Sequence, residues 1–151
     1  MMNMTQIDPA MARRVWQRVK GEAECQSELQ KLMEDLWEDG NIYRQLAQQR
    51  KGKRGSKYGL LYRQSMEQLR LLKGICALTQ KCDPVFSPVP QKKEPEGILL
   101  RRCYGRALQR LSWYAANEAD PQFGRMLPAL IRQTQSNSRL LLEMMSGANG
   151  R

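Results

Sequence analysis

Two pairs of polar residues interrupt the apolar stripes of two predicted helices, and each pair is spaced i, i+3. Ser65 and Gln68 form one pair, and Thr134 and Asn137 form the other. Residues three apart lie on the same helix face, so each pair would project toward the interior of a helical protein. Because a helix that buries one face normally keeps that face apolar, we interpret the pairs either as a hydrogen-bonded polar plug or as the remains of a functional site.

The chain contains no histidine, which limits the chemistry that such a site could perform. Imidazole is the commonest transition-metal ligand and the usual general base near neutral pH. Catalysis would therefore depend on carboxylate, tyrosine, cysteine or lysine groups. The four cysteines form no C-x-x-C pair, so neither a zinc site nor a redox dithiol is indicated. We expect reduced, buried thiols at Cys25, Cys76, Cys82 and Cys103.

The formal net charge is +10, and its densest part is the segment 50–57. We interpret this segment as a Gly-interrupted loop that could bind DNA or another polyanion. Few aromatic residues surround it, and solvation is the ordinary role of such cations, so polyanion binding is an alternative rather than the favoured function. The cations of the segment are Arg50, Lys51, Lys53, Arg54 and Lys57, and Lys92, Lys93, Arg101 and Arg102 could join them.

The elements that must position these groups are helices. Pro and Gly collect between long stretches rich in Leu, Gln, Arg, Glu and Met, which is typical of an all-α protein. The 151 residues suit one domain, residues 1–151, with a single core. The periodicity predicts a short helix at about 9–20 and bundle helices at about 27–49, 58–79, 98–117 and 121–146. Gly40 on the first apolar stripe would permit close approach of a neighbouring helix, and Pro128 would bend the last helix in its second turn.

The segment 80–97 contains four prolines and exceeds an ordinary helix–helix connection. It could cross the length of a bundle, since an extended residue covers about 3.3 Å. The short connections predict antiparallel pairs, and the long one predicts that the second and third bundle helices are parallel neighbours. A four-helix bundle with one long crossover in the middle is the ferritin-like arrangement.

Four runs of residues resemble, in their order and spacing, the ferritin-like, rubrerythrin-related domains of bacteria. The run 39–47, DGNIYRQLA, is similar to the family's D-A-x-x-Y-x-x-L-A, and the run 121–127, PQFGRML, is similar to the P-x-Y-G-x-V-F that opens its fourth helix. The run 72–75 looks like the segment after the E-x-x-H of its second helix, and 102–104 with Tyr114 match its third. The resemblance covers nearly everything from residue 8 to residue 145.

The resemblance implies a bundle whose relatives hold a di-iron or di-manganese centre. The ligands there are a carboxylate from each of two helices and an E-x-x-H from each of the other two. In this chain none of the matching positions has kept a ligand, so the resemblance implies a metal site that has been lost, and no cofactor is expected. The former ligand positions are Leu36, Ser65, Gln68, Ala107, Thr134 and Asn137.

We therefore expect a metal-free ferritin-like bundle that acts as a non-catalytic structural or interaction module. Its partner would be an unidentified protein, which could be a second copy of the chain. The alternative is a rubrerythrin-like oxidoreductase that binds iron or manganese through carboxylates, although we interpret the first four of the candidates mainly as a solvated face. The candidates are Glu34, Asp35, Glu38, Asp39 and Glu118.

No apolar run approaches the roughly 20 residues of a membrane-spanning helix. The first 19 residues contain neither an apolar signal region nor a small-residue cleavage site. The sequence therefore predicts a cytoplasmic protein without membrane contact.

Overall fold

The computed structural model describes residues 9–80 and 84–149, and within them the side chains of residues 28–80 and 84–147. This part of the chain is all-α, as predicted. None of its helices combines the length and the apolar character that crossing a lipid bilayer requires. The elements are α1 (Pro9–Gln49), α2 (Gly52–Gln80), α3 (Glu96–Ala116), the 3-10 helix η2 (Gly124–Met126) and α4 (Leu127–Asn149).

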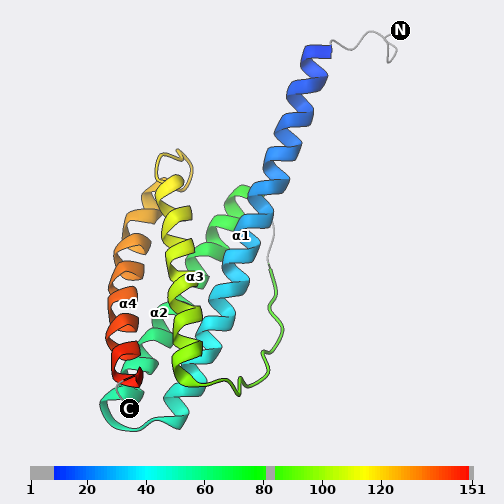
Figure 1. Cartoon of the computed structure of the whole chain (residues 1–151). Helices are drawn as coiled ribbons and strands as arrows, with labels where there is room; N and C mark the ends of the chain where they lie inside the picture. The colour runs from blue at the N-terminus through cyan, green and yellow to red at the C-terminus, as the bar shows by residue number, and fades with distance from the viewer. Residues whose placement is uncertain (1–8, 81–83, 150–151) are drawn as a thin grey trace.

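The four helices pack as two hairpins, α1 with α2 and α3 with α4. The segment 84–95, which we call the strap, runs back beside α1, so that α3 begins at the same end of the bundle as α2 (Figure 1). Contacts between the hairpins join α1 to α3 and α2 to α4. Helices α2 and α3 therefore run parallel on opposite corners of the bundle, which corrects the expectation that they are neighbours.

Two predicted boundaries near the N-terminal half are wrong. Helix α1 continues without a break from Pro9 to Gln49, where the sequence analysis expected separate helices at 9–20 and 27–49. The intervening residues 21–26 contain Glu, Ala and Gln but no proline, so a single glycine does not end the helix. Helix α2 begins at Gly52, so most of the expected basic loop is helical. Gly52 is the one glycine of the described residues with a positive φ, 70°, which glycine adopts without steric cost.

Pro128 does not lie in the second turn of the last helix, where the sequence analysis expected a bend. Helix α4 begins at Leu127 after the short η2 turn, so the proline lies in the first helical turn. The backbone N–H groups there have no partner within the helix, and proline removes nothing that the helix needs.

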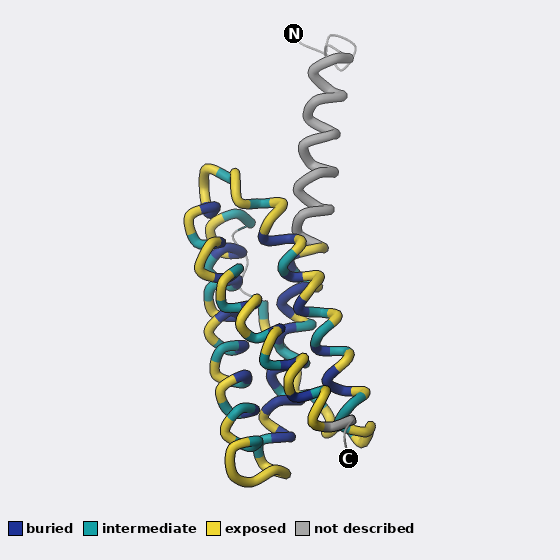
Figure 2. The backbone as a smooth tube through the Cα atoms, turned by 60° about the vertical axis from the view of Figure 1, so that its left-hand side comes forward, coloured by how far each residue is buried: buried dark blue, intermediate teal, exposed yellow. Residues whose placement is uncertain are grey.

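A polar layer divides the core into two apolar clusters. Figure 2 shows buried positions recurring along the four helices of the bundle. One cluster includes Leu36, Leu72, Trp113 and Leu127, and the other includes Tyr43, Leu61, Leu99 and Leu141. The buried polar residues between the clusters in sequence and along the bundle are Asp39, Ser65, Gln68, Arg110, Thr134 and Ser138.

Gly40 brings α1 close to α2 beside this layer, as predicted. A Cβ atom at this position would lie 2.3 Å from the Cε of Met66 and 3.5 Å from the Cβ of Ser65. Any larger residue would displace the Met66 side chain.

The cysteines agree with the expected reduced state only in part. Cys103 is a free, buried thiol. Cys76 is disulfide-bonded, so the expectation of a reduced thiol is wrong at this position. Cys25 and Cys82 lie outside the residues whose side chains the structure describes.

Candidate functional site

Five of the six positions that the resemblance matches to metal ligands are buried at the middle of the bundle. Leu36, Ser65, Gln68, Ala107 and Thr134 are each at most 2% exposed. Asn137 is only partly buried. The buried face of α4 instead passes from Thr134 to Ser138, whose hydroxyl donates to the Thr134 carbonyl oxygen at 2.8 Å.

Gln68 connects three helices through its side-chain oxygen. The Tyr114 hydroxyl of α3 donates to Gln68 Oε1 at 3.1 Å, and the Thr134 hydroxyl of α4 lies 3.2 Å from the same oxygen. Burial raises the pKa of Tyr114 to about 12, so its hydroxyl remains a donor. Gln68 and Thr134 therefore form the hydrogen-bonded polar plug that the sequence suggested. Among the described residues, no side-chain hydrogen bond joins Ser65 or Asn137 to them.

Asp39 adds a buried carboxylate to the same layer. It is fully shielded from solvent, with Oδ1 2.9 Å from Arg106 Nη1 and Oδ2 3.2 Å from Arg110 Nη1. Each carboxylate oxygen thus has its own guanidinium partner. The interpretation of Asp39 as part of a solvated face is wrong, because it lies three residues after Leu36 and four before Tyr43, on the inward stripe of α1.

The electrostatics of the layer reflect both burial and pairing. Burial raises the pKa of Asp39, and the guanidiniums of Arg110 and Arg106 oppose this rise. Burial disfavours the charged forms of the two arginines, but the neighbouring groups, with Asp39 foremost, leave the pKa of both raised. Cys103 Sγ lies 3.5 Å from Asp39 Oδ1, and burial beside this carboxylate raises the pKa of the thiol well above its ordinary value. The thiol is therefore held protonated.

Arg106 extends the ion pairs toward the surface. Its guanidinium also lies 3.4 Å from Glu38 and 3.7 Å from Asp35. Glu38 has a second cation, Lys92 of the strap, at 3.2 Å. The carboxylates of this part of α1 thus face arginine and lysine side chains.

The residues of the layer do not fit a di-metal centre. Such a centre needs several anionic or imidazole ligands that converge on one point, whereas here a single carboxylate faces two guanidiniums. Among the described residues, no group of three or more His, Cys, Asp or Glu side chains could hold a metal ion. Of the other candidate carboxylates, Glu34 is exposed on α1 and Glu118 is exposed in the connection after α3.

The predicted polyanion-binding segment is largely used within the protein. Arg50 Nη2 and Arg54 Nε each lie 2.8 Å from a carboxylate oxygen of Glu96. Lys57 Nζ lies 2.8 Å from Glu143 Oε1. Glu96 also accepts a hydrogen bond from the Tyr58 hydroxyl, in the first turn of α3 where a negative charge suits the helix dipole. Three of the five cations therefore join the α1–α2 turn to α3 and α4. Lys51 and Lys53 remain exposed.

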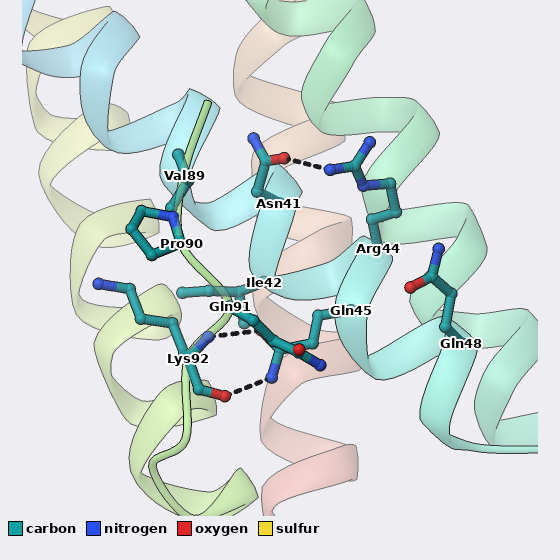
Figure 3. Close-up of a pocket in the computed structure, with 9 residues that line it drawn as sticks. All are labelled: Asn41, Ile42, Arg44, Gln45, Gln48, Val89, Pro90, Gln91 and Lys92. Carbon is teal, nitrogen blue, oxygen red and sulfur yellow. Dashed lines mark hydrogen bonds between the residues drawn. The ribbon is translucent and has the colours of Figure 1, made fainter. Parts of the chain in front are cut away.

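The strap is fastened to α1 by anchors that the sequence analysis did not anticipate. The Gln45 side chain accepts from the Lys92 backbone N–H at 2.7 Å and donates to the Lys92 carbonyl oxygen (Figure 3). Trp37 Nε1 donates to the Ser87 carbonyl oxygen at 2.8 Å, and its ring stacks on Phe86 with centroids 5.8 Å apart. Gln45 follows Trp37 by eight residues on α1. Neither residue carries a periodic signal that would reveal a contact 47 or 50 residues later.

Comparisons of the chain with models of protein families, with curated proteins and with solved structures give no match.

Proposed function

We propose that the chain is a ferritin-like bundle that has lost its di-metal centre and acts as a non-catalytic structural or interaction module. The observation that carries this proposal is the pair of guanidiniums, Arg106 and Arg110, on the buried carboxylate of Asp39. A guanidinium supplies the positive charge that a metal ion would otherwise bring to a buried carboxylate. Both arginines belong to α3, so side chains of the chain itself balance the charge of the buried carboxylate.

The connectivity supports the ferritin-like part of the proposal. The two hairpins are joined by one long segment, and the helices joined by it run in the same direction. Ferritin-like bundles have one long crossover. Support for the lost centre comes from the former ligand positions, since five of the six are buried at the level of the ion pairs.

Elemental analysis of the purified chain tests the proposal. We expect iron, manganese and zinc far below one ion per chain, both as purified and after incubation with each divalent metal followed by desalting. Asp39→Asn, which removes the only fully buried carboxylate among the described residues, should leave the metal content unchanged. One metal ion per chain or more that stays bound through desalting would overturn the proposal.

The oxidoreductase alternative requires a carboxylate cluster that is free to bind a metal. The nearest approach to one is Asp35, Glu38 and Asp39, and Arg106 contacts all three. The Arg106 guanidinium would repel a metal cation placed among these three carboxylates, so the arrangement opposes this alternative. Iron-dependent consumption of hydrogen peroxide by the purified chain would favour it instead.

A further inference from the structure

The outer side of the α3–α4 hairpin carries three exposed arginines that the fold does not use internally. They are Arg101 of α3 and Arg132 and Arg139 of α4. Within the described part of the chain, none of the three joins an ion pair or a side-chain hydrogen bond. Glu143 is the one carboxylate among the described exposed positions of the two helices, and it pairs with Lys57 of α2 at 2.8 Å. No carboxylate of this hairpin therefore balances the three arginines.

The α3 part of this surface points away from α1. Arg101 and Leu108 are seven residues apart, about two helical turns, so they form one stripe. At about 100° per residue, this stripe lies roughly opposite Arg110, which contacts Asp39 of α1. The Leu108 side chain is large and apolar, yet the residue is 45% exposed.

The α4 part of the surface points away from α2. Arg132 and Arg139 are also about two turns apart, and they lie roughly opposite Thr134, whose hydroxyl reaches Gln68 of α2. Leu142, which is 47% exposed, follows Arg139 by three residues. Because α3 and α4 pack side by side (Figure 1), the two stripes share the side of the hairpin that faces away from α1 and α2. We call this surface the arginine face, and its residues are Arg101, Leu108, Arg132, Arg139 and Leu142.

Two charges of the arginine face reinforce each other. Leu99 and Cys103 of α3 share a core cluster with Leu141 of α4, so the start of α3 lies beside the second half of α4. Arg101 is therefore at about the same level of the bundle as Arg139. Two guanidiniums at one level without a carboxylate raise the positive potential of the surface, which attracts anionic groups.

The exposed leucines and the spacing of the arginines indicate which anionic partner fits. Arg132 and Arg139 are about 10.5 Å apart along α4, the distance that separates carboxylates seven residues apart on a partner helix. A phosphate backbone would leave Leu108 and Leu142 in water, whereas the apolar stripe of an amphipathic helix would cover them. A second copy of the chain is disfavoured, because each copy carries a net charge of +10.

We propose that the arginine face binds an acidic amphipathic helix of a partner protein. Carboxylates of this helix pair with Arg101, Arg132 and Arg139, and its apolar side chains pack on Leu108 and Leu142. This inference rests on the proposed interaction role and specifies the chemistry of the partner. It does not depend on the absence of a metal from the central layer.

Nuclear magnetic resonance titration of the full chain with a model helix tests the inference. The probe is a blocked peptide with three repeats of the heptad Leu-Ala-Ala-Leu-Glu-Gln-Glu, in which glutamates flank a stripe of leucines. The reference peptide carries lysine in place of every glutamate. At about 50 mM salt, where exposed charges are weakly screened, the acidic peptide should shift the α3 and α4 amides around the arginine face until they saturate. The reference peptide should leave them unchanged.

Charge reversal in matched pairs locates the bound peptide. Arg132→Glu/Arg139→Glu replaces two attractions by two repulsions, so the affinity for the acidic peptide should fall at least about tenfold. The control is Arg63→Glu/Arg70→Glu, which makes the same change at two exposed positions of α2 with the same spacing. Glu67 lies between these two positions and offsets their charge, so the affinity should stay within about twofold of the parent.

Truncation of the exposed leucines tests the apolar part of the contact. Leu108→Ala/Leu142→Ala should weaken binding about three to five times, because the partner helix then covers less apolar surface. The matched control is Leu60→Ala/Leu78→Ala on α2, where the two leucines are 38% and 56% exposed. This control should bind the acidic peptide as the parent does.

The absence of a saturable shift with the acidic peptide would overturn the inference, and so would equal losses in the α2 variants. A loss in the arginine variant without a loss in the leucine variant would mean that the face attracts any polyanion, which also contradicts it. Displacement of the peptide by duplex DNA or by vesicles containing phosphatidylserine would assign the face to a nucleic acid or a membrane instead. None of these results changes the metal content, so failure of the arginine face and failure of the metal-free proposal are distinguishable.

Discussion

Arg110 of α3 and Asp39 of α1 form an ion pair of 3.2 Å inside the bundle, with the two residues 4% and 0% exposed. The partners belong to different hairpins. A buried ion pair contributes little net stability compared with an apolar pair of similar size, but removal of one partner leaves an uncompensated charge. Any packing of the two hairpins that separated Asp39 from Arg110 would leave both charges buried without a partner. The pair therefore favours this packing more than it adds to net stability.

Replacement of Asp39 by asparagine should destabilise the protein strongly. The variant leaves Arg106 and Arg110 without the carboxylate that both contact. We expect the free energy of unfolding to fall by about 3–5 kcal/mol in urea denaturation. The control is Glu34→Gln, the same chemical change at an exposed position, which should remain within about 0.5 kcal/mol of the parent.

The double variant Asp39→Leu/Arg110→Leu should be much more stable than Asp39→Asn alone. The Arg110 Nε has no hydrogen-bond partner among the described residues, so the native pair already includes an unsatisfied polar atom. Replacement of a buried pair by apolar residues is often neutral or stabilising. A double variant as unstable as Asp39→Asn would show that the pair stabilises the fold in its own right.

Tyr114→Phe and Thr134→Val should have coupled effects on stability. Each substitution removes one hydroxyl next to Gln68 Oε1, and each should cost about 1 kcal/mol in urea denaturation. The loss in the double variant should exceed the sum of the two, because Gln68 then loses both hydroxyl partners from α3 and α4. Strict additivity would indicate that Gln68 finds another partner.

The protein should lose stability in acid partly through Glu96. Burial acts to raise the pKa of this carboxyl, but hydrogen bonds from Tyr58 and Arg54, with the charges of Arg54 and Arg50, lower it below the ordinary value of 4.5. The folded state therefore binds this proton less readily than the unfolded state. Glu96 stabilises the fold above that ordinary value, and its contribution is lost as the pH falls through the folded-state pKa.

Thermal unfolding of Glu96→Gln between pH 6 and pH 3 measures this contribution. The variant should be less stable at pH 6 and should lose less stability on acidification than the parent. Glu67→Gln, at an exposed position of α2, should follow the parent curve at both ends. A parallel acid dependence of Glu96→Gln and the parent would refute the assignment.

Gln45→Leu should release the strap without unfolding the bundle. The variant removes the acceptor of the Lys92 backbone N–H and the donor to its carbonyl oxygen. Hydrogen exchange of the Lys92 amide should accelerate at least about tenfold, equivalent to about 1.4 kcal/mol of local opening. Amides of α2 and α4 should keep their protection, and uniform acceleration across the chain would mean that Gln45 supports the whole fold.

Binding to duplex DNA, if measured, should depend only weakly on salt. Arg50, Arg54 and Lys57 pair with glutamates, so of the five cations in the segment 50–57 Lys51 and Lys53 remain to displace counterions. Two phosphate contacts give a slope of about −2 in a plot of log affinity against log salt concentration, compared with about −4.5 for five contacts. A slope near −4.5 would mean that the ion pairs open on binding and would revive the polyanion alternative.

The helical class and the long connection could be predicted from the sequence because they depend on local signals. Prolines in the strap and periodic leucines in the helices act within a few residues of one another. The break expected between residues 20 and 27 was wrong because one glycine among helix-favouring residues is too weak a signal. The start of α2 at Gly52 could not be predicted because Arg54 pairs with Glu96 and Lys57 pairs with Glu143, 42 and 86 positions later. No local pattern reveals such pairs.

The candidate site was predicted in position but not in chemistry. The spacing of Gln68 and Thr134 indicated a polar layer, and their side chains meet there. Asp39 lies at helical spacing between Leu36 and Tyr43, and Arg110 lies between Ala107 and Tyr114, so both had a periodic signal. Their charges argued for solvent exposure, since Asp and Arg are rarely buried unless paired. Only the three-dimensional contact between α1 and α3 reveals that they pair.

The division of the bundle into two hairpins has a consequence for the order of folding. Contacts within each hairpin join segments that are close in the chain, whereas Asp39 and Arg110 are 71 residues apart. Local contacts form early because closing a short loop costs less entropy. Each hairpin can therefore form while its charged groups remain hydrated. When the two hairpins dock, the Asp39 carboxylate and the guanidiniums of Arg106 and Arg110 must lose water. Dehydration of these charges, rather than helix formation, would limit the rate, and stopped-flow refolding at different salt concentrations would resolve such a phase.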